Sequence, residues 1–139
     1  MDLDTALSFA TDNRRSILIT LRGNGRPQSS NVTHLVSEGR FLVSVTEDRA
    51  KTRNARRDPR VSLHVLGPDF WSYVVVEGEA TLGLVAAAPD DDAVEALVRY
   101  YRAAAGEHPN WDEYRAAMVA ERRLLLTIEP THAYGMLPG

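Results

Sequence analysis

The sequence predicts a mainly β fold of the α+β class, in which an antiparallel barrel carries helices packed on its outside. Short runs of alternating apolar and polar residues fill most of the chain, as is typical of strands with one buried face. Turn residues separate these runs. Helical periodicity is confined to the N-terminus, one basic segment and a late stretch, so strands and helices do not alternate as in a parallel sheet.

The first half predicts a helix, three strands and a second helix. The opening helix is amphipathic and ends near residue 12, and Asn24-Gly25 predicts a hairpin turn after the first strand. Pro27 opens the second strand, and the three strands are expected to form a meander. The short basic helix is expected to be capped by residues 46–48 and ended by Pro59. The predicted strands are residues 16–21, 28–36 and 41–46.

The second half predicts three more strands and two helices. A fourth strand covers residues 61–66, and a long fifth strand runs from Trp71 to about Leu84. Pro89 and the three aspartates after it predict a helix start, because acids are favoured at the positive end of a helix. That helix stops at Gly106, and another follows from Trp111. The last strand runs from residue 122 and extends past Pro130, which makes six strands in all.

Composition limits the kind of protein. Its 139 residues are expected to form one domain, residues 1–139, and a chain of this size gains stability from oligomerisation. The net charge of −3 argues against a general nucleic-acid binder. The N-terminus lacks the basic region of a signal peptide, and no apolar run is long enough for a membrane span. With no cysteine present, the sequence fits the reducing cytoplasm.

One basic segment, RAKTRNARRDPR at residues 49–60, dominates the charge pattern. It holds six basic residues against Asp58, whereas the whole chain is acidic. Lys51 is the only lysine in the sequence. A compact ammonium beside arginine forks suits a multiply charged anion, so the segment predicts a phosphate site. A solvated basic turn, or a nucleic-acid contact, is the alternative interpretation.

A polar strand and an exposed tryptophan are further candidates. Gln28, Ser29, Ser30 and Asn31 occupy consecutive strand positions, and their side chains match the edge of a heterocyclic ligand. A solvent-facing edge strand would look the same. Trp71 follows a turn and would lie at the mouth of the barrel, where pockets open, unless it packs in the core or at a dimer interface.

The sequence lacks the usual catalytic motifs. The four histidines have no metal-ligand spacing, no nucleophile elbow is present, and neither glycine-rich nucleotide fingerprint occurs. No metal site is therefore expected. Because the candidate groups bind ligands but include no acid–base pair, any chemistry is expected to come from a cofactor.

Three motifs resemble one family. RPQSSNV at residues 26–32, the basic segment, and WSYVVVEGEA at residues 71–80 are similar to the flavin and deazaflavin split-barrel proteins of the pyridoxamine-phosphate-oxidase-like group. The RAKTRN form resembles the actinobacterial branch that uses the deazaflavin coenzyme F420. The resemblance implies a homodimer of six-stranded antiparallel split β-barrels, with two cofactor sites at the interface.

The resemblance also implies which residues bind the cofactor. The basic segment would contact the phosphate, the polar strand would approach the deazaflavin and its ribityl chain, and the partner's copy of Trp71 would cover the ring. Arg26 and Arg56 are weaker candidates for an acidic oligoglutamate tail. The implied cofactor-binding residues are Gln28, Ser30, Asn31, Thr46, Arg49, Lys51, Thr52, Asn54 and Trp71.

The implied activity is a coenzyme F420-dependent oxidoreductase. Reduced deazaflavin would pass a hydride to a conjugated small-molecule acceptor such as a quinone, an enone or a tetrapyrrole like biliverdin, while the protein supplies position and electrostatics. Two alternatives remain open at this point: an FMN-binding oxidoreductase of the same fold, and a non-catalytic F420-binding carrier or sensor. The physiological substrate is not indicated by any motif.

Overall fold

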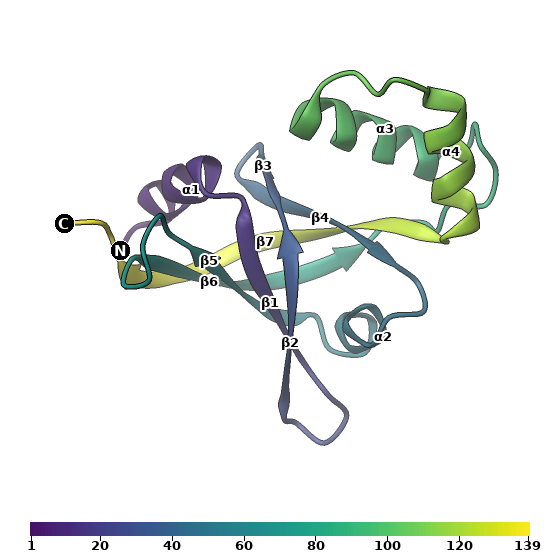
Figure 1. Cartoon of the computed structure of the whole chain (residues 1–139). Helices are drawn as coiled ribbons and strands as arrows, with labels where there is room; N and C mark the ends of the chain where they lie inside the picture. The colour runs from purple at the N-terminus through teal and green to yellow at the C-terminus, as the bar shows by residue number, and fades with distance from the viewer.

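The computed structural model describes residues 1–139 and is built on one strongly curled sheet of seven antiparallel strands (Figure 1). The strands lie in the order β2-β1-β5-β6-β7-β4-β3. Their bounds are β1 Arg15–Leu21, β2 Pro27–Thr33, β3 Leu35–Ser37, β4 Arg40–Thr46, β5 Arg60–Leu66, β6 Tyr73–Leu82 and β7 Arg123–Met136. The mainly β, antiparallel architecture with outer helices is therefore as predicted.

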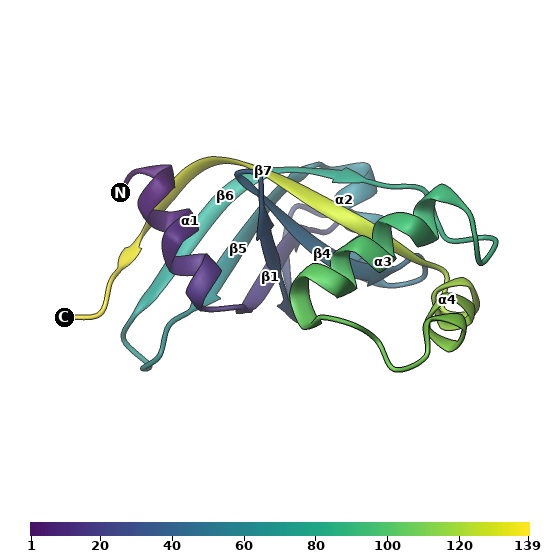
Figure 2. The ribbon, with the colours of Figure 1, turned by 90° about the horizontal axis from the view of Figure 1, so that it is seen from above.

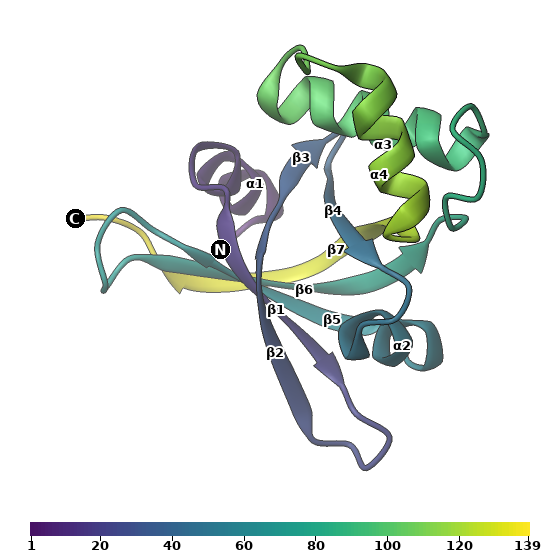
Figure 3. The ribbon, with the colours of Figure 1, turned by 45° about the vertical axis from the view of Figure 1, so that its right-hand side comes forward.

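A bend at His34 explains why the structure has seven strands where six were predicted. The stretch predicted as one strand divides into β2 and β3, which are separated by this single residue. β2 pairs with β1 at one edge of the sheet, whereas β3 pairs with β4 at the opposite edge. Figure 3 shows β2 and β3 running on from each other across the curl. The bent segment therefore closes the barrel on one side of His34 and leaves β2 and β4 apart on the other.

His34 is held at this bend by three hydrogen bonds. Its backbone N–H donates to the Arg14 carbonyl (3.0 Å), and its ring nitrogens lie 2.8 Å from Ser16 Oγ and 2.9 Å from the Ala10 carbonyl oxygen. Since the side chain is buried, these contacts tie the bend to β1 and to the first helix. The expected three-stranded meander is thus interrupted here, because the second strand changes partners halfway along.

Every second residue of the strands points into the barrel and fills it, as the sequence predicts. Leu18, Val43, Leu63 and Leu126 are almost completely buried, and their sequence neighbours face outward. The hairpin between β1 and β2 turns at Asn24-Gly25, where Gly25 has a φ of 83°. The helix α1 (Leu3–Asp12) closes one end of the barrel with Ala6, Phe9 and Ala10.

A helical hairpin packs beside the barrel (Figure 2). It consists of α3 (Asp92–Ala105) and α4 (Trp111–Ala120), with its own small core around Leu97 and Met118. Asp91 caps α3 by accepting from the Val94 N–H at 2.8 Å, and Gly106 ends it with a φ of 82°. None of the four helices has the length and apolar character needed to cross a bilayer.

Two predicted boundaries differ from the structure. The basic helix α2 (Ala50–Arg57) begins after Arg49 and has no side-chain cap, so residues 46–48 do not cap it. β6 begins at Tyr73, and Trp71 lies in the preceding turn. That turn is closed by Asp69, whose carboxylate accepts from the N–H groups of Trp71 (2.8 Å) and Ser72 (3.0 Å), which delays the strand by two residues.

Candidate cofactor site

A cavity of about 320 Å³ lies where β2 and β4 separate. Five elements meet there: the end of β2, the end of β4, the start of α2, one turn of α3 and the start of β7. No carboxylate lines it. The lining residues are Asn31, Val32, Thr33, Ser44, Val45, Thr46, Arg49, Lys51, Tyr100 and Arg123.

The N-terminus of α2 forms one end of this cavity. Arg49 is the N-cap residue and makes no capping side-chain hydrogen bond, so the first N–H groups of the helix have no side-chain acceptor. Uncapped N–H groups and the helix dipole together favour an anion at this position. Arg49 and Lys51 flank the same end, and neither forms an ion pair within the chain.

The charge at this end of the cavity is not neutralised. Burial lowers the pKa of the Lys51 ammonium, and the positive charges of Arg49 and Arg123 lower it further. No acidic side chain raises the pKa of this ammonium in return. An anion placed between these side chains would reverse the effect, so the cavity is electrostatically suited to a phosphate.

A buried hydroxyl in the same place has no partner. Thr46 Oγ1 is the only buried side-chain oxygen or nitrogen in the chain that lacks a hydrogen bond. The hydroxyl is close enough to Asp48 to be the main cause of the lowered pKa of that carboxyl, but the two groups are not in hydrogen-bond geometry. Because an unsatisfied buried hydroxyl is costly, its presence beside two free cations indicates a ligand that accepts or donates here.

Six lining residues were not predicted from the sequence, and two of them come from elements late in the chain. Tyr100 comes from α3 and Arg123 from the start of β7, far from the basic segment in the chain. Arg123 Nη1 lies 3.3 Å from Ser44 Oγ, and its Nε donates to Glu121 at 3.0 Å. No local pattern marks either residue, since they reach the cavity only through the packing of the helical hairpin and β7 against β4.

The structure brings together four of the nine predicted residues: Asn31, Thr46, Arg49 and Lys51 all line the cavity. Thr52 and Asn54, from the same basic segment, do not. Thr52 is fully buried and its hydroxyl donates to the Thr46 carbonyl, while Asn54 Nδ2 donates to Thr20 Oγ1 at 3.2 Å. These two side chains face the barrel because α2 turns them inward, so they support the site instead of lining it.

Gln28 and Ser30 also lie away from the cavity. They share one face of β2, and Asn31 lies on the other, as strand alternation requires. Gln28 Oε1 accepts from Asn54 Nδ2 at 2.6 Å, so this side chain attaches β2 to α2. Only the end of the polar strand, from Asn31 to Thr33, faces the cavity.

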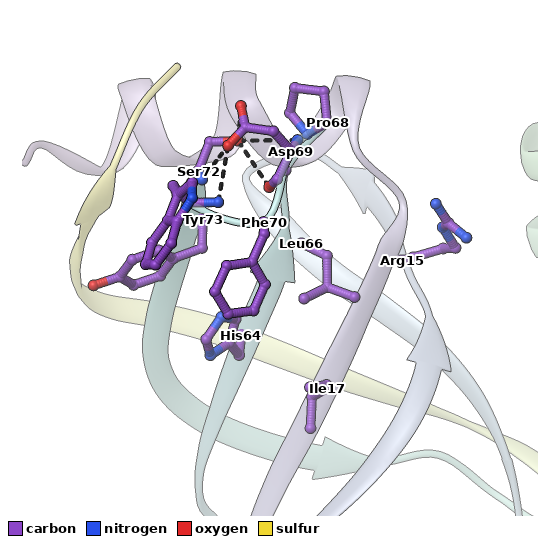
Figure 4. A pocket seen from close by; sticks show the side chains of 11 residues that line it. Arg15, Ile17, His64, Leu66, Pro68, Asp69, Phe70, Ser72 and Tyr73 are labelled. Atoms are coloured by element: carbon purple, nitrogen blue, oxygen red, sulfur yellow. Dashed lines mark hydrogen bonds between the residues drawn. The ribbon is translucent and has the colours of Figure 1, made fainter. Parts of the chain in front are cut away.

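Trp71 lines a different cavity, of about 690 Å³, on the outer face of the sheet. Figure 4 shows this cavity with Phe70, His64 and Leu66 in its wall. The Trp71 side chain is 73% exposed and stands edge-on to Phe70, with ring centroids 4.7 Å apart. Leu66 and Ile17 form the apolar wall, and the His64 ring stacks on Tyr73. Within one chain Trp71 therefore does not contribute to the phosphate end of the site.

Three arginines of the basic segment that do not line the cavity form hydrogen bonds or an ion pair within the chain. Arg56 pairs with Glu47, Arg57 donates to Asn54 Oδ1 at 2.9 Å, and Arg53 donates to the Asp48 carbonyl at 2.7 Å. The expectation that Arg56 is free to meet an acidic tail is therefore not supported. Nowhere in the chain do three histidine, cysteine or carboxylate side chains gather as metal ligands would.

A family model described as "Pyridoxamine 5'-phosphate oxidase" matches residues 3–136, nearly the whole chain. The match includes every element that lines the cavity.

Solved structures of similar fold belong to proteins with different described functions. An F420 reductase is 21% identical, with a TM-score of 0.67 over 91% of this chain and 94% of that one. The conserved hypothetical protein Rv2991 of Mycobacterium tuberculosis is 21% identical, with a TM-score of 0.73 over 100% and 90%. The heme storage protein HutZ of Vibrio cholerae is 14% identical, with a TM-score of 0.69 over 97% and 95%. At these identities the likeness establishes the fold.

Proposed function

Because the chain belongs to the pyridoxamine 5'-phosphate oxidase family, we propose that the cavity between β2 and β4 binds the phosphate of a flavin-type redox cofactor, with coenzyme F420 as the first candidate. The protein would then act as an F420-dependent reductase. One observation carries the proposal: the uncapped start of α2, two unpaired cations and the unpartnered Thr46 hydroxyl all meet at one end of the same cavity.

Each residue has a definite role in this proposal. Lys51 and Arg49 hold the phosphate through charge-assisted hydrogen bonds, and the first N–H groups of α2 complete its shell. Thr46 Oγ1 donates to the same group. When bound, a reduced deazaflavin supplies the hydride for a conjugated acceptor such as a quinone, an enone or a tetrapyrrole, and the protein's part is to position and shield it.

Two facts favour F420 over FMN. The RAKTRN pattern resembles that of F420-dependent relatives, and an F420 reductase is among the proteins of similar fold. Arg26, at the exposed end of the β1–β2 hairpin, forms no ion pair and remains a candidate for the acidic tail. FMN is the second candidate, because it shares a phosphate and a three-ring system and the family includes flavin-dependent oxidases.

A homodimer is part of the proposal. Leu66, Tyr73 and Met136 lie side by side across β5, β6 and β7, and Phe70 and Trp71 stand exposed next to them. Such a group of apolar side chains on one sheet face is typical of an interface. A second copy covering this face would bring its Trp71 toward the cofactor, as the family resemblance implies.

Titration of the purified protein with F420 and FMN tests the proposal. F420 carries more negative charges than FMN, so we expect it to bind more tightly and to lose affinity more steeply with added salt. Fluorescence quenching measured over a salt series gives both quantities. Equal affinities and equal salt slopes would favour FMN, and no binding of either compound would reject the proposed site. Tight F420 binding without turnover of any acceptor would instead indicate a carrier or sensor.

A further inference from the structure

Three hydroxyl-bearing residues line the cavity away from the basic segment in the chain. Thr33 ends β2, Ser44 lies near the end of β4, and Tyr100 of α3 reaches between them. The gap between the two strands is thus lined by hydroxyl groups as well as by cations. Arg123 lines the same cavity, contacts Ser44 Oγ at 3.3 Å, and its charge acts on both Lys51 and Tyr100.

The Tyr100 hydroxyl lies against both strands without being used by either. Burial raises its pKa, and the Thr33 side chain and the Ser44 backbone lower it in part, so the oxygen is near both groups. Yet no hydrogen bond of good geometry joins it to Thr33, Ser44 or any other group. The Tyr100 hydroxyl lies in the cavity wall and can both donate and accept a hydrogen bond. It is therefore available to a ligand.

The position of Tyr100 is rigid. Its neighbour Tyr101 packs in an aromatic cluster with His108, Trp111 and Tyr114, at ring-centroid distances of 5.0–5.7 Å. At the end of α3, Arg14 Nη1 donates to the Ala104 carbonyl at 2.7 Å. The helix is therefore fixed to α4 on one side and to the start of β1 on the other, which holds Tyr100 in the gap.

We infer that Tyr100, with Thr33 and Ser44, forms a subsite for the hydroxyl chain of the cofactor and selects ligands that carry a polyol next to their phosphate. The inference rests on the proposed phosphate site at α2. The cations and the hydroxyl groups line one cavity of about 320 Å³, so a phosphate held by Lys51 places the atoms next to it near Tyr100. Hydroxyl groups there meet three protein hydroxyls, and none of the lining residues offers a carboxylate for a cationic ligand.

This assignment changes which residues recognise the ribityl chain. The polar strand was expected to do so through Gln28, Ser30 and Asn31, but of these three only Asn31 lines the cavity. Tyr100 lies far along the chain, on a helix that no cofactor motif includes. It is a specificity-determining residue in this inference, since it contacts the part of the ligand that differs between phosphate esters.

The test measures three ligands against four variants. The ligands are F420 or FMN (whichever binds in the titration above), the same compound without its phosphate, and 4-nitrophenyl phosphate, which has a phosphate but no polyol. We expect Tyr100→Phe to weaken the first two ligands by the same factor, about three- to tenfold, and to leave the third unchanged. Lys51→Ala should weaken the two phosphate-containing ligands and spare the dephosphorylated one.

Tyr101→Phe is the matched control, because it removes the same atom from the adjacent residue, which faces α4. Thr33→Val removes the hydroxyl across the gap from an exposed strand position and should reproduce the Tyr100→Phe selectivity. Loss of affinity for all three ligands in Tyr100→Phe, or equal effects of Tyr100→Phe and Tyr101→Phe, would overturn the polyol subsite. If the wild-type protein binds neither F420 nor FMN, the phosphate site itself is wrong.

Discussion

The Thr52 hydroxyl donates a hydrogen bond of 2.6 Å to the backbone carbonyl of Thr46, and so joins the first turn of α2 to the end of β4. Thr52 is fully buried, and Lys51 precedes it directly. The bond therefore sets the distance between the helix that carries the cations and the strand that carries the unpartnered hydroxyl. Thr52 does not line the cavity, so within this chain the bond connects elements of the scaffold around the site.

Thr52→Val tests this role, since valine keeps the shape and loses the donor. The Thr46 carbonyl would keep only the bond from the Arg49 N–H (3.3 Å), so we expect the free energy of unfolding to fall by about 0.5–1.5 kcal/mol and cofactor affinity to fall with it. Urea denaturation and ligand titration measure the two effects. The control is Thr81→Val on the exposed face of β6. A stability equal to wild type would show that the bond does not hold α2 in place.

Lys51→Ala should weaken cofactor binding more than Arg57→Ala. Lys51 lines the cavity and has no acidic partner, whereas Arg57 donates to Asn54 and to the Leu21 carbonyl. A charge-assisted hydrogen bond is worth about 1.5–3 kcal/mol, which corresponds to a rise in dissociation constant of roughly tenfold to over a hundredfold. Arg57→Ala is expected to lower stability with little change in affinity. Equal affinities in the two variants would contradict the assignment.

Phe70→Ser should shift a homodimer toward monomer. The Phe70 ring is 83% exposed, stands on a turn held by Asp69, and borders the apolar rows of β5, β6 and β7. Removing a large ring at the centre of an interface commonly costs 2 kcal/mol or more, about thirtyfold in the dimer dissociation constant. Leu84→Ser is the control, since Leu84 is 77% exposed but lies beyond the far end of β6.

Light scattering at several micromolar concentrations gives the mass of each form. A wild-type protein that is monomeric throughout this range would refute the homodimer. A Leu84→Ser variant that dissociates as readily as Phe70→Ser would place the interface elsewhere.

The stability of the protein should depend on pH through His34. Burial lowers the pKa of this histidine below its ordinary value of 6.5, so below pH 6.5 the unfolded chain binds the proton more readily than the folded one. The free energy of unfolding is therefore complete above pH 6.5 and falls as pH decreases from there toward the folded pKa, by at most about 1.4 kcal/mol per pH unit.

Denaturation between pH 7.5 and 5 measures this slope, above the range in which ordinary carboxylates titrate. His34→Gln should be less stable and should lose the His34 part of the slope, whereas His132→Gln, on an exposed position of β7, should keep it. An unchanged slope in His34→Gln would assign the pH dependence to other groups.

Local patterns predicted most of the elements correctly. Asn24-Gly25 marks the hairpin turn, and Asp91 and Gly106 mark the ends of α3. In β6, buried Val76 and Ala80 and exposed Glu77 and Glu79 show the alternation expected of a strand with one buried face. These features were readable because their physical causes lie within a few residues: turn geometry, capping and the two-residue period of a strand.

The basic segment shows what a local sequence pattern leaves undecided. Its charge predicted an anion site, and Arg49 and Lys51 do line a cavity free of carboxylates. The sequence did not separate these two residues from Thr52 and Asn54, which the helix turns toward the barrel. Whether a polar side chain in a motif contacts ligand or supports the scaffold depends on which side of the helix packs, and that is decided by the neighbouring strands.

By itself the sequence determined the antiparallel class, most strand faces, the ends of α3 and the concentration of positive charge near residue 50. Only the tertiary structure decided that the second strand bends at His34 and pairs with both edges of the sheet, which opens the gap between β2 and β4. It also brought Tyr100 of α3 and Arg123 of β7 to that gap. The physical reason is that pairing across long separations depends on which surfaces are left to bury once the local elements have formed, and no short stretch of sequence carries that information.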